Sequence, residues 1–207
     1  PILEELGALP AVEEAGFLPK PGATMVWGSG SSPWSWYFKE TSQRYPHSYQ
    51  VWRPQFDQIL LDNARAAGVT VVEGAHVSEV IFDDGEAVGV EFTNADGVEG
   101  EAECRFIVDA SGQSTLLARH LEYKQWDPFF QNLAVYAYFT GGDPLPEPDQ
   151  NNIFIESYQH GWLWSIPLHT GRTSVGAVVD SKIGQEGIQK EGAKAFLEFQ
   201  LSQSTHT

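Results

Sequence analysis

The sequence predicts an α+β fold with a βαβ-like element, and three observations support this prediction. Apolar residues recur at helical spacing from Pro54 to Ala67, with Pro54 suited to a first helical position and Gly68 to a stop. Strand-like segments separated by turn signals follow over residues 76–104. A short apolar run, Phe106–Val108, then precedes another helical segment and is typical of a buried strand. Helix, meander, buried strand and helix in this order indicate an α+β fold.

The part of the chain before the long helix combines helical and aromatic segments. Residues 2–15 place apolar residues at helical spacing, and Pro10 predicts a break within them. Strands are expected at residues 24–27 and 34–38, around a joint rich in glycine and serine at residues 28–33. We therefore expect a broken helix followed by two strands.

Beyond the long helix the pattern is mainly that of β structure. A strand is expected at residues 69–72, followed by a meander with strands at 76–82, 87–93 and 98–104. Eleven acidic residues and one basic residue lie from Glu73 to Asp109. We interpret this excess of acidic residues as a solvated face of the meander.

The last third of the chain predicts a second group of strands closed by a helix. The expected strands cover residues 133–139, 153–156, 162–166 and 174–179, and the expected helix covers 188–199.

Composition excludes several classes of protein. The chain has 12 basic and 28 acidic residues, and its net charge of −16 opposes binding to nucleic acid or to anionic membranes. A single cysteine, Cys104, makes neither an internal disulfide nor a cysteine zinc site, and it indicates a reducing, cytoplasmic compartment. No apolar run has the length of a membrane span, and the scattered histidines predict no metal site. The chain begins without methionine and stops directly after a helical pattern, so we expect an internal fragment.

The first candidate site follows the short apolar run. Asp109 and Gly112 come directly after it, and Ser114 precedes the next helical segment. Backbone N–H groups and the positive end of a helix at such a turn hold phosphates or ribose hydroxyls. The same residues also suit a turn with no ligand, and the sequence leaves both interpretations open.

The second candidate site is a strand with two tryptophans, Gly-Trp-Leu-Trp-Ser-Ile-Pro at residues 161–167. The period of two places Trp162, Trp164 and Ile166 on one face, and Pro167 ends the ladder because it has no N–H. Two indoles that only fill a core fit the same pattern.

The third candidate site is Lys20. It lies between Pro19 and Pro21, which stiffen its backbone, and an aromatic strand follows. A lysine in a loop is usually a solvated charge. Lysine can also take part in catalysis, as an ammonium that donates hydrogen bonds or as a desolvated amine that acts as a nucleophile. The sequence does not choose between these roles.

Together, these sites resemble flavin-dependent halogenases. Trp162–Pro167 is similar to the W-x-W-x-I-P signature of that family, and Phe17–Gly28 is similar to its F-x-x-K-x-G-A…W-G segment. Residues 108–119 resemble the internal Asp-Gly motif of flavoprotein hydroxylases, and residues 49–57 resemble their V-x-R-x-x-F-D segment.

The resemblance implies an α/β FAD-binding fold of the glutathione-reductase-like type, incomplete here, with a mixed β-sheet on the substrate side. The N-terminal G-x-G-x-x-G segment of such folds is absent, so this chain alone is expected to bind FAD poorly and to be inactive. The implied segments are a substrate side with the catalytic lysine (1–52), part of the FAD-binding domain with the meander (53–125) and a truncated β-sheet substrate domain (126–207).

The resemblance also implies roles for individual residues. Lys20 is expected to be catalytic and to receive hypohalous acid that reaches it from the flavin. The bulky strand is expected to keep organic substrate away from the flavin, so that halide is oxidised instead. Its shielding residues are Trp162, Trp164, Ile166 and Pro167, and the residues expected near FAD are Arg53, Asp109 and Gly112.

The implied reaction uses FADH2 from a separate flavin reductase, dioxygen, and chloride or bromide. The implied substrate is an electron-rich aromatic of the phenol or pyrrole type, free or tethered to a carrier protein. Two alternatives remain: a related FAD-dependent reductase or monooxygenase of the prenyl-reductase type, and a non-enzymatic ligand-binding module built on exposed tryptophans.

Overall fold

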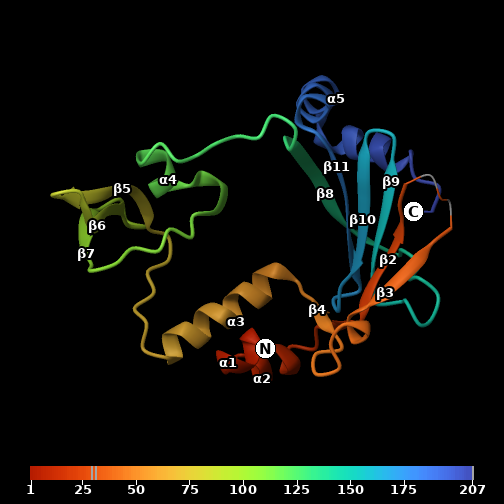
Figure 1. Cartoon of the computed structure of the whole chain (residues 1–207), viewed down its shortest axis with the longest axis horizontal. Helices are drawn as coiled ribbons and strands as arrows, with labels where there is room; N and C mark the ends of the chain where they lie inside the picture. The colour runs from red at the N-terminus through yellow and green to blue at the C-terminus, as the bar shows by residue number, and fades with distance from the viewer. Residues whose placement is uncertain (29, 31, 207) are drawn as a thin grey trace. The chain divides into compact units, whose positions relative to one another are not determined.

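A computed structural model describes residues 1–28, 30 and 32–206 (Figure 1). The chain forms two compact units, one made of residues 1–66 with 130–207 and the other of residues 67–129. Helices and a mixed sheet confirm the α+β prediction. The glycine- and serine-rich joint includes Ser29 and Ser31, which lie outside the described residues.

The first unit is built on a six-stranded sheet with the strand order β3-β2-β9-β10-β11-β8. Strands β2 and β9 are parallel, and the other neighbours are antiparallel. Its strands are β2 (Gly22–Val26), β3 (Trp34–Tyr37), β8 (Asn132–Thr140), β9 (Ile153–Tyr158), β10 (Gly161–Pro167) and β11 (Arg172–Asp180). The six strands predicted in these regions are confirmed. Strands β9, β10 and β11 pair in sequence order, and β8 pairs with β11 at the edge of the sheet.

Helix α5 (Ser181–Leu201) packs on one face of this sheet (Figure 1). The core between them joins Val135, Leu163 and Val179 of the strands to Phe196 and Leu197 of the helix. Because side chains alternate along a strand, these apolar positions commit the sheet to one covered face.

The last helix starts earlier than its apolar pattern predicts. The Asp180 carboxylate accepts hydrogen bonds from the backbone N–H groups of Lys182 and Ile183, at 2.9 and 3.4 Å, and so caps the helix at Ser181. At Gly192, where φ is +83°, the helix is interrupted by a kink.

The N-terminal part of the first unit is helical with a small two-stranded sheet. Gly7, with φ of +68°, separates the first two helices, whereas Pro10 belongs to the first turn of the second. The predicted break at Pro10 is therefore wrong, because a proline in the first turn of a helix loses no hydrogen bond. The elements here are α1 (Ile2–Glu5), α2 (Leu9–Glu14), β1 (Leu18–Lys20), the 3₁₀ turn η1 (Phe38–Glu40), β4 (Ser48–Gln50) and α3 (Arg53–Ala66), and β1 pairs with β4.

The second unit is the predicted acidic meander with a short helix. Its strands β5 (His76–Asp83), β6 (Glu86–Thr93) and β7 (Glu99–Glu103) pair in sequence order. The 3₁₀ turn η2 (Gly112–Ser114) and helix α4 (Leu116–His120) follow. The ring of His120 stacks on Phe82 with 4.5 Å between centroids, which fixes α4 against β5.

Two predicted strands of this unit are wrong. Residues 69–72 and Phe106–Val108 have no strand structure, so the βαβ-like element is absent from the described residues. Phe106 and Val108 are 85% and 80% exposed. A buried parallel strand needs neighbours on both edges and cover on both faces, and the described part of this unit supplies neither for this run.

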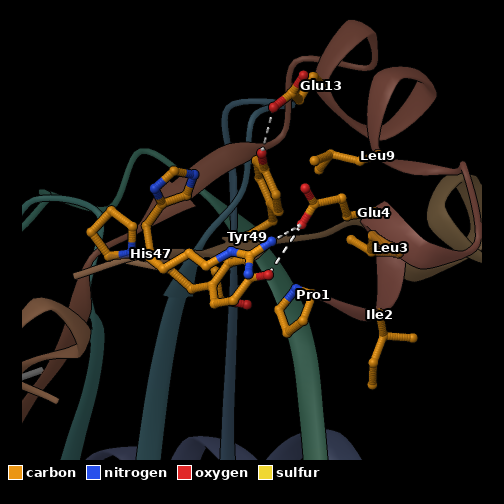
Figure 2. Close-up of a pocket in the computed structure, with 12 residues that line it drawn as sticks. Pro1, Ile2, Leu3, Glu4, Leu9, Glu13, His47 and Tyr49 are labelled. Carbon is orange, nitrogen blue, oxygen red and sulfur yellow. Dashed lines mark hydrogen bonds and ion pairs between the residues drawn. The ribbon is translucent and has the colours of Figure 1, made fainter. Parts of the chain in front are cut away.

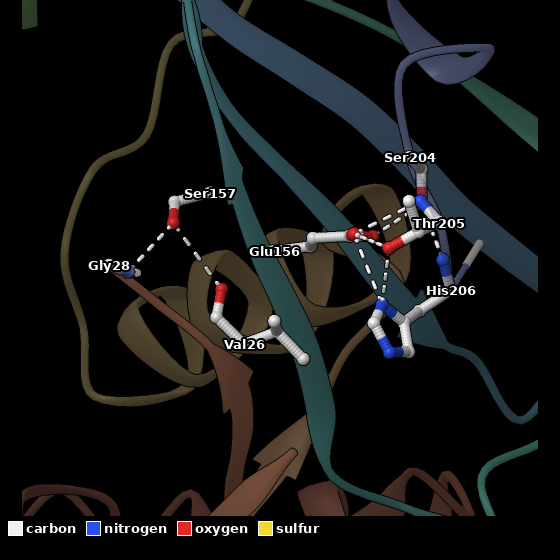
Figure 3. Close-up of polar contacts among 7 residues, drawn as sticks. All are labelled: Val26, Gly28, Glu156, Ser157, Ser204, Thr205 and His206. Carbon is white, nitrogen blue, oxygen red and sulfur yellow. Dashed lines mark hydrogen bonds and ion pairs between the residues drawn. The ribbon is translucent and has the colours of Figure 1, made fainter. Parts of the chain in front are cut away.

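A buried carboxylate ties the end of the chain to the sheet of the first unit (Figure 3). Glu156 of β9 is 3% exposed and accepts hydrogen bonds from the hydroxyl of Ser204 and from both the backbone N–H (3.0 Å) and the hydroxyl (2.9 Å) of Thr205. His206 Nδ1 lies 3.2 Å from the same carboxylate. Burial by itself raises the pKa of Glu156, but these hydrogen bonds outweigh it and lower the pKa to about 2.

We expect Glu156 to make the stability of the first unit depend on pH in the acid range. Its pKa in the fold, about 2, lies below the ordinary 4.5, so its ionised form stabilises the fold above about pH 4.5 and this contribution is lost as the pH falls towards 2. Glu156→Gln should therefore cost about 3 kcal/mol of unfolding free energy at pH 7 and progressively less below pH 4.5. Urea unfolding at a series of pH values measures this difference.

Glu101→Gln is the matched control, because Glu101 is exposed in the meander. A Glu156→Gln penalty that stays constant from pH 7 to pH 2 contradicts the prediction.

Candidate functional site

The two tryptophans of β10 lie on the face of the sheet opposite to α5. Leu163 between them points into the core and is 1% exposed, whereas Trp162 and Trp164 are half-buried on the other face. Their ring centroids are 5.9 Å apart with 50° between the planes. The predicted alternation is confirmed, and the indoles do not belong to the α5 core.

Aromatic side chains lie at both edges and in the middle of this face. Strand pairing places Trp164 beside Ile155 on β9, and Ile155 beside Met25 on β2, which in turn pairs with Trp34 on β3. On the other side Trp164 pairs with Gly176 on β11, which pairs with Tyr136 on β8. Paired residues project to the same face, so one row of mostly large apolar side chains crosses all six strands.

Trp164 is held by its neighbours on β11 and β8. Its Nε1 donates a hydrogen bond to Ser174 Oγ at 3.3 Å. The Tyr136 ring lies 6.1 Å from the Trp164 ring at an angle of 40°. The orientation of this indole is therefore set by a polar contact as well as by packing.

Lys20 ends β1, two residues before β2 of the large sheet. It pairs with Ser48 of β4, and its side chain is half-buried. Burial lowers the pKa of Lys20. Among the described residues its side chain has no hydrogen bond or ion pair. A partly desolvated amine with no carboxylate partner is available for chemistry in a way that a solvated lysine is not.

A contact of aromatic rings joins the segments that carry the lysine, the arginine and the tryptophans. His169, two residues after Pro167, lies edge-on to Phe17 with 4.9 Å between centroids, and its Nε2 lies 3.1 Å from Gln55 Oε1 in α3. Phe17 also contacts Phe56 of α3, at 6.2 Å between centroids. The structure thus brings together three segments that are far apart in sequence.

A hollow of about 470 Å³ lies beside β4, between α1, α2 and residues 44–49 (Figure 2). Tyr45 and Tyr49 donate hydrogen bonds from their hydroxyls to Glu4 and Glu13, at 3.1 and 3.4 Å. Burial and these carboxylates raise the pKa of both tyrosines. Lys20 does not line this hollow, so the hollow is separate from the predicted lysine site.

Arg53 begins α3 on the surface of the first unit. Its guanidinium forms a bidentate ion pair with Asp57, at 2.9 and 3.1 Å. The dipole of this fourteen-residue helix favours an anion at its first turn, where Arg53 and its ion-pair partner Asp57 lie. These features fit the phosphates of a dinucleotide such as FAD.

Asp109 and Gly112 form a turn in the second unit. The Asp109 carboxylate accepts hydrogen bonds from the backbone N–H groups of Ser111 (3.0 Å) and Leu117 (2.8 Å), and hydrogen bonds from Ser111 are the main cause that lowers the pKa of Asp109. Gly112 has φ of +63°, a conformation that favours glycine. Asp109 and Ser111, rather than the predicted Ser114, bond the first backbone N–H groups of α4. This turn is well ordered by its own hydrogen bonds.

Other site types find no support in the described part of the chain. No group of three or more His, Cys, Asp or Glu side chains there is arranged to hold a metal ion. None of the described helices is long and apolar enough to cross a membrane.

Sequence reasoning missed the residues that hold Trp164, namely Ser174 and Gly176. An isolated glycine in the pattern Ser-Val-Gly-Ala-Val-Val was an available signal, because glycine inside a strand marks a close approach of another group. His169 was missed because its partners are distant in sequence.

Comparisons with known proteins find relatives along most of this chain. A family model described as tryptophan halogenase matches residues 31–207. A tryptophan 2-halogenase of Chondromyces crocatus is 35% identical, over 97% of this chain and 40% of its own length. A 1H-pyrrole-2-carbonyl-[peptidyl-carrier protein] brominase of Pseudoalteromonas luteoviolacea is 33% identical, over 86% of this chain and 43% of its own length. The chain thus spans about two fifths of the length of these relatives.

Solved structures give the same result. The myxobacterial chondrochloren halogenase CndH, described as a new variant of FAD-dependent halogenases, matches with a TM-score of 0.86 and 41% identity, over 96% of this chain and 45% of its own. A geranylgeranyl bacteriochlorophyll reductase-like protein of Thermoplasma acidophilum matches with a TM-score of 0.71 at 16% identity, over 96% of this chain and 50% of its own. At that identity the second match shows the fold alone. FAD-dependent halogenases among the structural neighbours agree with the α+β fold of an FAD-binding type.

We expect the tryptophans to differ in their access to a neutral quencher. Trp27 and Trp34 are 52% and 51% exposed, whereas Trp162 and Trp164 are half-buried. Acrylamide should therefore quench a Trp162→Phe/Trp164→Phe variant more completely than the unaltered chain, and a Trp27→Phe/Trp34→Phe variant less completely. Equal quenching of the two variants would support exposed indole platforms instead.

Proposed function

The chain belongs to the tryptophan halogenase family, and from this premise we propose that its protein is a flavin-dependent halogenase. The observation that carries the proposal is the half-buried pair Trp162 and Trp164 on the face of the sheet that α5 leaves uncovered. The matched relatives are named as halogenases and brominases, and this supports the assignment.

The proposed reaction has two parts. FADH2, dioxygen, a halide ion and a proton give FAD, hypohalous acid and water, and the hypohalous acid then replaces a ring hydrogen of the aromatic substrate with halogen and releases water. FADH2 supplies the two reducing equivalents for the first part when it is bound. The protein has to keep the aromatic substrate apart from the flavin and to guide the oxidised halogen to the ring.

Trp162 and Trp164 are the residues we assign to the separation. Their rings form a continuous wall with Tyr136, and the Trp164 ring is fixed by its bond to Ser174. Ile166 lies on the same face, and Pro167 ends the strand. A fixed wall of bulky rings excludes an aromatic molecule by its size while leaving room for a halide ion.

Lys20 is the residue we assign to guidance. Its half-buried amine has no ion-pair partner among the described residues. As an ammonium it donates a hydrogen bond to the oxygen of hypohalous acid, which makes the halogen more electrophilic. Its lowered pKa also increases the fraction of free amine, the form that reacts with hypohalous acid to give a haloamine and water. Both routes place the halogen at Lys20.

Arg53, Asp109 and Gly112 are the residues we assign to FAD. The α3 end with Arg53 suits the phosphates, and the Asp109–Gly112 turn has a backbone bend at Gly112 suited to close approach. The segments 1–52 and 126–207 then form the substrate side, and 53–125 forms part of the FAD-binding domain.

We further propose an electron-rich aromatic substrate of the phenol or pyrrole type, free or bound to a carrier protein. The named substrates of the relatives, tryptophan and a carrier-bound pyrrole, share rings that react readily with electrophilic halogen. FADH2 would come from a separate flavin reductase, with chloride or bromide as co-substrate. We propose a cytoplasmic location, because a single cysteine is typical of proteins in a reducing compartment.

We expect Lys20→Ala to abolish halogenation without stopping flavin oxidation, because the lysine acts after hypohalous acid has formed. Product formation from a phenol or a carrier-bound pyrrole should fall by at least about a hundredfold, while FADH2 consumption in the whole protein stays close to that of the unaltered enzyme. Mass spectrometry of the product and flavin absorbance measure the two quantities.

Lys39→Ala is the matched control, since Lys39 is exposed and lies in the same unit. Undiminished halogenation by Lys20→Ala would refute the role of the lysine. Product formation that needs no halide would refute the halogenase proposal in favour of a reductase or hydroxylase.

A further inference from the structure

We infer that Gly176 positions the Trp164 indole, with Ser174 fixing its other end, and so sets the shape of the aromatic wall. The position of the indole is inferred from the geometry of the first unit. Its effect on activity rests on the proposed halogenase function. Neither residue belongs to the strand whose sequence signals the function.

The bare backbone of Gly176 is the surface on which the indole lies. A Cβ atom at Gly176 would lie 2.5 Å from both Cζ2 and Cη2 of Trp164 and 2.6 Å from Cβ of Tyr136. These distances are far shorter than a carbon–carbon contact, which is about 3.5–4.0 Å. The six-membered ring of Trp164 therefore occupies the space that any other side chain at position 176 would need.

Backbone conformation does not explain the glycine. Gly176 is in the middle of β11 and is absent from the set of glycines with positive φ. Its two neighbours along the strand, Val175 and Ala177, are ordinary strand residues that are buried on the other face of the sheet. The demand for glycine at this position comes from the two side chains that lie against it, the Trp164 ring and the Tyr136 Cβ.

Ser174 provides the second fixed point. It lies two residues before Gly176 on the same face, and its hydroxyl accepts the hydrogen bond from Trp164 Nε1. The indole is thus laid across β11, with its six-membered ring over Gly176 and its nitrogen at Ser174. Trp162 and Tyr136 limit movement on either side, at 5.9 and 6.1 Å between ring centroids.

For the proposed function, this packing fixes how far the Trp164 ring extends from the sheet. A side chain at position 176 moves the indole away from the sheet and breaks its hydrogen bond to Ser174. The displaced ring then changes the shape of the space in front of the sheet. The separation between substrate and flavin then fails, although Lys20 and the residues assigned to FAD are unchanged.

The test combines Gly176→Ala, Trp164→Phe and the double variant in the whole protein. Phenylalanine lacks the outer indole atoms that the new Cβ would meet, so Trp164→Phe should offset the damage of Gly176→Ala. We expect Gly176→Ala to lower the melting temperature and to change the circular-dichroism exciton band of the Trp162–Trp164 pair. In the Trp164→Phe background, the same substitution should lower the melting temperature by less than in the unaltered protein, since only the contact with Tyr136 Cβ remains.

The functional readout is the amount of halogenated product formed per FADH2 oxidised. Gly176→Ala should lower this ratio by about tenfold, through misplacement of the ring, while the rate of FADH2 oxidation is retained. Ser174→Ala should lower it less, because one of the two fixed points remains. Gly142→Ala is the matched control, since a Cβ there would meet only Thr173 Oγ1, at an ordinary 3.7 Å.

Several outcomes would overturn the inference. One is an exciton band and a product ratio unchanged in Gly176→Ala, and another is a loss of stability that is equally large with Phe at position 164. If Gly176→Ala does not fold, recovery of folded protein in the double variant supports the inference, and failure to recover it assigns the need for glycine to Tyr136 instead of Trp164 and refutes the inference. Absence of halogenation by the unaltered protein would instead refute the proposed function, while the melting temperatures and the exciton band still decide the role of Gly176.

Discussion

The packing of α5 against one face of the six-stranded sheet is the constraint on which the rest of the first unit depends. Leu163, Val179 and Phe196 meet in that core, and their burial fixes which residues of each strand point towards the helix. A shift of β10 by one residue would place its tryptophans in the core and Leu163 outside. The core residues therefore determine the orientation of the indoles, although they do not touch them.

Trp164 and Lys20 are held in different ways. Trp164 is held by strand pairing, a hydrogen bond and a glycine without a side chain, all from elements of the same sheet. Lys20 lies at the end of a short strand outside that sheet, half-buried and without an ion-pair partner among the described residues. In the proposed halogenase, the tryptophan rings have to keep a fixed position, whereas the amine of Lys20 has to remain unpaired. The contacts of Trp164 and the surroundings of Lys20 meet these two requirements.

The failed strand predictions have a common physical cause. Phe106–Val108 has the composition of a buried strand, but strand formation requires hydrogen-bond partners from other segments, and the described part of the second unit supplies none for this run. The meander was predictable because each of its strands pairs with the next along the chain across a short turn. The start of α5 was misplaced for a local reason, the capping by Asp180, which hydrophobic periodicity does not detect.

The sequence alone indicated which residues are candidates for chemistry, because alternation on β10 separates the tryptophans from Leu163 and because Lys20 lies in a distinctive setting between two prolines. It did not determine how those residues are held. The contacts of Trp164 with Ser174 and Gly176, and those of His169 with Gln55 and Phe17, join segments that are separate in the chain. Only the tertiary structure decided these contacts, since strand order and register arise from the burial of the whole sheet rather than from any local pattern.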